Sequence, residues 1–158
     1  MLFLAFLFAG LHSFAFAGVE LQVVETSPAG QNIELGLNEK FSLKIAYDTD
    51  EPIDIWARPF FQGSQVDAMS NASVKRQGQG FALGWFSFTE PAEVDEVRLI
   101  IARRGSNDGE QMLSYPVSIQ AGGDSAGPAA ASWVSALTDQ ETVLRREAAD
   151  NYAHENPI

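Results

Sequence analysis

FSLKIAY, residues 41–47, alternates large side chains with smaller or polar ones. Phe41, Leu43, Ile45 and Tyr47 occupy every second position, and successive residues of a β-strand point to opposite faces of a sheet. The stretch therefore predicts a strand with one face buried in a hydrophobic core.

The same period of two recurs on both sides of this stretch, and groups of turn-forming residues separate the repeats. Such groups lie at 27–30, 48–52, 62–64 and 105–109. Short strands at this spacing are typical of a two-sheet antiparallel fold. We predict an all-β domain over residues 18–120, an immunoglobulin-like antiparallel β-sandwich of about seven strands. The expected strands are 20–25, 33–37, 41–47, 53–61, 81–88, 97–101 and 113–119.

Residues 1–17 differ from the rest of the chain. The first eleven are almost all apolar, and Ala15-Phe16-Ala17 offers the small residues that signal peptidase requires. We therefore predict a signal peptide over 1–17, with Gly18 as the first mature residue and a periplasmic or secreted protein. A retained anchor is the alternative, because no Lys or Arg precedes Lys40. The stretch is shorter than the roughly 20 residues of a spanning helix, which favours cleavage. No later segment is apolar enough to span a membrane, so we expect no membrane span after cleavage.

The composition changes again after residue 120. Residues 121–131 are mostly Ala, Gly and Ser, which predicts a flexible linker. Residues 132–158 follow as a helical tail, with Trp133, Leu137 and Leu144 on a narrow apolar stripe. Such a helix is marginal alone in water. We expect it to become ordered against a partner protein, and docking on the sandwich through Trp133 is the alternative.

Composition excludes several kinds of function. The chain has no cysteine, two histidines and a net charge of −11. Phosphate backbones and anionic lipids require clustered basic residues, so we expect no nucleic-acid partner. The usual ligands of zinc and iron–sulfur sites are missing, and His154, at the end of the tail, is the only histidine after the predicted cleavage. We predict a protein that is not an enzyme and holds no cofactor or metal; hydrolysis by paired carboxylates is the remaining catalytic alternative.

Two residue groups offer candidate sites. Asp48, Asp50, Glu51 and Asp54 have the oxygen ligands that calcium prefers, but their spacing is not that of an EF-hand and a solvated turn explains them as well. Aromatic residues occupy both odd and even positions of 53–61 and 81–88, so some of them must lie outside the core. Most are expected in the core, and Trp56, Phe60 and Trp85 are the candidate binding face.

Part of the sequence resembles a group of uncharacterised exported bacterial proteins. The resemblance is carried by residues 21–30, 45–53, 82–86 and 94–98 and covers about two thirds of the chain. It implies export and a small β-sandwich followed by a linker and a helical segment. It brings no catalytic residues with it.

These observations favour a non-catalytic interaction or scaffold domain of the cell envelope with a protein partner rather than a small-molecule ligand. A carbohydrate-binding module that uses Trp56 or Trp85 as a stacking platform is the alternative.

Overall fold

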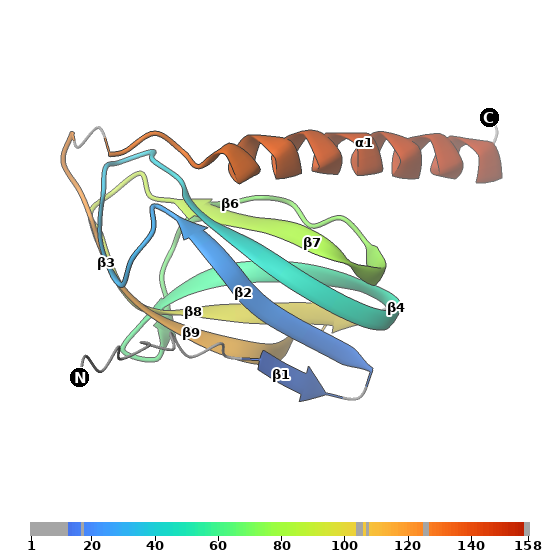
Figure 1. Cartoon of the computed structure of the whole chain (residues 1–158), viewed down its shortest axis with the longest axis horizontal. Helices are drawn as coiled ribbons and strands as arrows, with labels where there is room; N and C mark the ends of the chain where they lie inside the picture. The colour runs from blue at the N-terminus through green and yellow to red at the C-terminus, as the bar shows by residue number, and fades with distance from the viewer. Residues whose placement is uncertain (1–12, 17, 104–105, 107, 125–126, 157–158) are drawn as a thin grey trace, which may run out of the picture.

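The protein is mostly β, as its computed structural model shows (Figure 1). Among the described residues, nine strands form one open, mixed sheet that is followed by one helix. The strands are β1 (Ser13–Phe16), β2 (Val19–Ser27), β3 (Asn32–Leu35), β4 (Phe41–Phe61), β5 (Ser64–Gln65), β6 (Met69–Ser70), β7 (Arg76–Ser87), β8 (Ala92–Arg103) and β9 (Glu110–Ala121), and the helix is α1 (Ser132–Glu155). The structure describes residues 13–16, 18–103, 106, 108–124 and 127–156.

β4 is the longest strand, and its two halves have different neighbours. Residues 41–49 pair with β2 on one side and β7 on the other, whereas residues 53–60 pair with β8. β9 and β3 continue the sheet beyond β8. β2 also approaches β9 without pairing with it, so the sheet curls and brings its two parts face to face.

One hydrophobic core fills the curl. It contains buried residues from both halves of β4, among them Ile45 and Ile55, together with residues of β2, β3, β7, β8 and β9. The two parts meet closely at Gly84 of β7, where a Cβ atom would lie 2.9 Å from the Cβ of Ala57. The predicted core face of residues 41–47 is confirmed for Phe41, Leu43 and Ile45, which are fully buried, and Tyr47 is half-buried against the same core. Ser42, on the opposite face, is also buried.

The mostly β fold and the C-terminal helix were predicted, but two details of the sheet were wrong. β3 pairs with β9 in parallel, so the sheet is not purely antiparallel. The expected strands 41–47 and 53–61 are one strand, because residues 48–52 stay extended instead of forming a closed turn. A period of two indicates which face of a strand is buried, but not the partner or direction of that strand.

The N-terminal prediction lies largely outside the described residues. Residues 1–12 and 17 are not described, and Ser13–Phe16, which belong to the predicted signal peptide, form β1 beside β2.

The C-terminal segment returns to the sheet. The amide of Ala131 donates to Oγ of Ser27 at 3.0 Å, and the amide of Gly127 donates to Oε1 of Glu39 at 2.9 Å. α1 then runs along β7 and β4, and its C-terminal part extends past the end of the strands (Figure 1). The structure thus places the helix against the sheet, the alternative to a helix that only a partner orders.

Candidate functional site

Trp56 and Phe60 lie on the side of β4 that faces away from the core. In this half of the strand Ile55 and Ala57 are buried in the core, while Trp56 and Arg58, the residues that follow each of them, are half-buried. The second face of the strand therefore carries large side chains without belonging to the core.

Pairing with β8 completes this surface. Ile100 is the register partner of Trp56, and Arg98 is the partner of Arg58. We call Trp56, Arg58, Phe60, Arg98 and Ile100 the aromatic–arginine face.

Arg98 is held by its neighbours on this face. Its guanidinium stacks over the ring of Phe60, with the central carbon 3.9 Å from the ring centroid, and Nε donates to Oε1 of Glu96. The Ser114 hydroxyl donates to the other oxygen of Glu96, and this bond, followed by the interaction with Arg98, lowers the pKa of Glu96. Phe60 is buried yet outside the core cluster, so it supports Arg98 and is not an open platform.

The positive charge of Arg58, unlike that of Arg98, is not paired with a carboxylate in the described part of the chain. Its Nη1 donates to Oγ of Ser70 at 2.6 Å, and its central carbon lies 5.9 Å from the ring centroid of Trp56. Within the described part of the chain no carboxylate forms an ion pair with Arg58. Burial lowers the pKa of Arg58, because its charged form is partly shielded from water. Like charges opposite each other on neighbouring strands are destabilising, so Arg58 and Arg98 are an unfavourable pair in the free protein.

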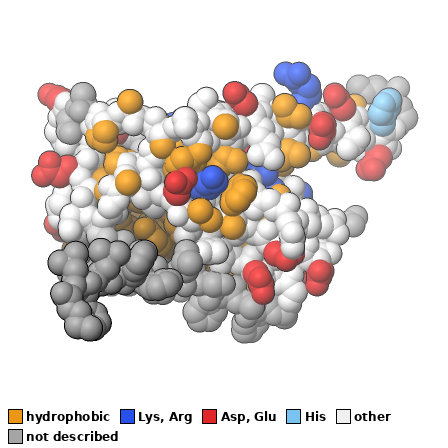
Figure 2. Space-filling model, in the orientation of Figure 1, with side chains coloured by type: hydrophobic (Ala, Val, Ile, Leu, Met, Phe, Trp, Pro, Cys, Tyr) orange, Lys and Arg blue, Asp and Glu red, His pale blue; other side chains and the backbone are white. Residues whose placement is uncertain are grey.

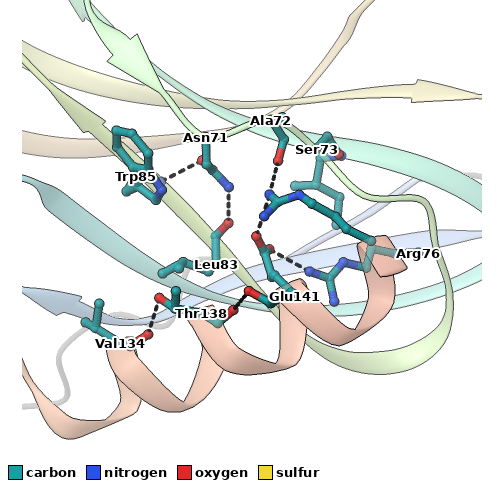
Figure 3. Close-up of polar contacts among 12 residues, drawn as sticks. Asn71, Ala72, Ser73, Arg76, Leu83, Trp85, Val134, Thr138 and Glu141 are labelled. Atoms are coloured by element: carbon teal, nitrogen blue, oxygen red, sulfur yellow. Dashed lines mark hydrogen bonds and ion pairs between the residues drawn. The ribbon is translucent and has the colours of Figure 1, made fainter. Parts of the chain in front are cut away.

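Trp85, the third aromatic candidate, does not join this face. It lies on β7 opposite Ser42, in the part of the sheet that pairs with the first half of β4. Nζ of Lys40 lies 4.1 Å from the centroid of the Trp85 ring. The backbone amide of Trp85 donates to Oδ1 of Asn71 at 3.0 Å (Figure 3). The side chain is half-buried.

The helix residues singled out by sequence, Trp133, Leu137 and Leu144, lie on the part of α1 nearest the sheet. Leu137 is 7% exposed, and the other two are half-buried. After Leu144 every described residue of α1 is exposed.

A buried ion pair joins α1 to β7. Nη2 of Arg76 lies 2.6 Å from Oε1 of Glu141, and the two side chains are only 3% and 6% exposed. Glu141 also accepts from Arg145, which in turn donates to the carbonyl of Ala72 at 2.8 Å (Figure 3). Nη1 of Arg76 is buried without a hydrogen-bond partner, which makes this contact costly unless Glu141 remains in place.

A groove lies on the outer surface of β2, β4 and β7. Figure 2 shows apolar side chains gathered below the helix, with basic and acidic side chains among them. The groove has a volume of about 380 Å³, and the ring of Phe81 beside it is 43% exposed. Two amides and two carboxylates share the lining with this ring: Gln22, Gln79, Glu20 and Asp48.

The acidic residues of 48–54 do not converge on one point. Asp54 pairs with Lys75, Glu51 pairs with Arg103, and Oδ2 of Asp48 accepts from Gln79 at 2.8 Å. Over the described ranges no group of three or more potential ligands is placed to hold a metal ion. Glu20 and Asp48 are register partners on neighbouring strands, so they lie side by side and not across a cleft.

Comparison with known proteins identifies no relative: no family model and no curated protein matches this chain. The resemblance to exported bacterial proteins stays a prediction. No helix within the described residues is long and apolar enough to cross a membrane.

Sequence reasoning missed the two arginines of the face and the groove at Phe81. Arg58 and Arg98 are 40 positions apart, and only the pairing of β4 with β8 makes them neighbours. A signal was present in the sequence. Trp56, Arg58 and Phe60 occupy every second position, so in a strand they lie on the same face.

Proposed function

We propose that this protein is a non-catalytic, exported interaction domain of the cell envelope and that it binds a partner protein through the aromatic–arginine face. The observation that carries the proposal is the half-buried Trp56 beside Arg58, whose charge no described carboxylate pairs with. Trp and Arg are the residue types most enriched at the energetic centres of protein interfaces. A partner that covers this face gains apolar burial and meets an unbalanced charge.

The proposal includes an immunoglobulin-like sandwich as the scaffold. Pairing in the order β2–β4–β7–β6 and β4–β8–β9 corresponds to the A-B-E-D and C-F-G orders of that fold, with the two halves of β4 in the places of strands B and C. The shared core between the two parts supports it. Fold alone assigns no function, and the surface residues are what support binding.

Export is supported by the sequence of residues 1–17 alone. The apolar stretch and Ala15-Phe16-Ala17 are typical of a cleaved signal peptide. A periplasmic or secreted location follows from that prediction.

The test is retention of a partner from an envelope extract on immobilised protein. Trp56→Ala removes the centre of the face, and Val143→Ala, which truncates an apolar residue 52% exposed on α1, is the matched control. We expect wild type and Val143→Ala to retain the same protein and Trp56→Ala to lose it while its thermal unfolding is unchanged. The same retained proteins for all three would contradict the proposal.

A carbohydrate-binding module is the second candidate, and the groove at Phe81 favours it. Nζ of Lys44 lies 4.7 Å from the centroid of the Phe81 ring, but the side chain remains 43% exposed. The ring can stack on a sugar through the face that Lys44 leaves open, and the flanking amides and carboxylates can bind the sugar hydroxyl groups. In this case the platform is Phe81 and not Trp56 or Trp85.

A glycan array separates the two candidates. Binding that disappears in Phe81→Ala and persists in Trp56→Ala supports the carbohydrate module. Absence of signal on a broad array removes it.

A further inference from the structure

Arg58 differs from the described arginines of β8 in having no carboxylate partner among the described residues. Arg98 pairs with Glu96, and Arg103 pairs with both Glu51 and Glu110. Arg58 has only the hydroxyl of Ser70 as an acceptor among the described residues. It also faces Arg98 across the strand pair, so an anion that arrives at Arg58 relieves an unfavourable arrangement.

The geometry leaves Arg58 ready to accept an anion. A guanidinium has five N–H donors, and the bond from Nη1 to Ser70 uses one and restrains the side chain. The remaining donors allow the two parallel hydrogen bonds that a carboxylate accepts. Because the site is partly shielded from water, such a pair is stronger there than on an open surface.

The side chains around Arg58 and the net charge of the protein restrict the kind of molecule whose carboxylate can bind there. The ring of Trp56 lies next to the guanidinium, and Ile100 is opposite Trp56, so atoms attached to the carboxylate meet apolar surface. The net charge of −11 repels a polyanion. A partner surface that fits this face therefore presents a single carboxylate among apolar and neutral or basic groups.

We infer that the aromatic–arginine face binds a carboxylate side chain or C-terminal carboxylate of a partner protein, and that Arg58 is the residue that receives it. This inference rests on the function proposed above and adds the chemistry of the contact. Trp56 and Ile100 hold the apolar part of the same partner residue or of its neighbours.

The experiment uses benzoate as the probe, because benzoate joins one carboxylate to an apolar ring, and benzamide is its neutral counterpart. In the full chain with Trp85→Phe and Trp133→Phe, Trp56 is the only tryptophan and its emission reports on the face. At constant ionic strength we expect benzoate to change the emission saturably and benzamide to bind at least about tenfold more weakly. Arg58→Gln is expected to weaken benzoate binding about tenfold or more, because a charged hydrogen-bonded pair is lost.

Arg103→Gln is the matched control, since that arginine already has carboxylate partners, and it should leave benzoate binding unchanged. If Arg58→Gln does not fold, Arg58→Lys decides, because it keeps the charge and loses the bidentate fork; weaker binding is expected. Equal binding of benzoate and benzamide, or undiminished binding by the Arg58 variant, would overturn the inference.

Two further outcomes have a defined meaning. If the protein shows no preference for benzoate over benzamide but still retains an envelope protein in a Trp56-dependent way, this inference is overturned and the proposed interaction function stands. A concentration-dependent dimer that dissociates in Arg58→Gln would show that the carboxylate comes from a second copy, and would overturn the choice of a different protein.

Discussion

Replacing Glu141 by alanine is expected to release α1 from the sheet. The substitution leaves the charge of Arg76 buried, at 3% exposure, with neither Nη1 nor Nη2 paired to an acceptor. Removing one partner of a buried ion pair costs about 3–5 kcal/mol. If the helix moves away, water reaches Arg76 and that cost disappears.

The free energy with which α1 docks on the sheet limits how much stability the Glu141→Ala variant can lose. Leu137 is the only fully apolar side chain of α1 that is buried within the described residues, and its burial contributes about 1.5–3 kcal/mol. Half-buried Trp133 adds part of another side chain. Because these terms are comparable to the penalty at Arg76, we expect undocking, with a loss of about 3 kcal/mol in the free energy of unfolding.

Hydrogen exchange along α1 and the emission of Trp133 measure this release. Glu141→Ala should speed exchange over residues 132–145 and shift the emission of Trp133 to the red, while Glu147→Ala, an exposed position on the same helix, should do neither. Arg76→Met combined with Glu141→Leu should keep the helix docked, since well-packed apolar residues can replace a buried pair. Unchanged exchange in Glu141→Ala, or equal release in the double variant, would show that the buried ion pair does not hold the helix on the sheet.

Further predictions concern the core, the close contact between the two parts of the sheet, and the linker. Ile45→Asp should lower the free energy of unfolding, measured by chemical denaturation, by more than about 4 kcal/mol, because it buries a charge. Lys44→Asp, on the opposite face, should lower it by no more than about 1 kcal/mol. Equal losses would mean that the register of this strand is wrong. Gly84→Val should lower stability by about 1–3 kcal/mol, since its Cβ meets the second half of β4, and an unchanged melting temperature would contradict that contact. The amide of Gly127 and a second backbone amide lower the pKa of Glu39 below its ordinary value of 4.5, so their contact is complete above about pH 4.5 and is lost as the pH falls through the lowered value. The protection factor of the Gly127 amide, which is its intrinsic exchange rate divided by its observed rate, should therefore fall in acid in the wild type and show no such step in Glu39→Gln.

Much of the fold follows from local pattern, because burial of one strand face requires a period of two. The alternation at residues 41–47 identified Ile45 and its neighbours as core. It could not show that residues 48–52 remain extended, since residues that favour turns also occur in bent strands. The parallel pair of β3 with β9 joins residues more than 80 positions apart, and no local signal specifies such a pairing.

The candidate site was predictable in part for the same reason. Trp56 was a candidate for an open face because aromatic residues occupied both faces of its strand, although most of them were expected in the core, and it is half-buried. Phe60 was expected beside it, but Arg98 covers its ring. The side chain of Glu141 lies outside the predicted apolar stripe and yet is only 6% exposed. Its partner Arg76 lies 65 positions earlier in the chain, so no local pattern indicates this contact.

Photo-cross-linking in the cell can show whether a partner binds at the aromatic–arginine face. Benzoylphenylalanine is placed at Ile100, within the face, and in a separate variant at Ser118, an exposed position on β9. We predict a discrete adduct with another protein from Ile100 that is lost when Arg58→Gln is added, and no adduct from Ser118. Adducts from Ser118 alone, or an Ile100 adduct that Arg58→Gln leaves unchanged, would contradict the account.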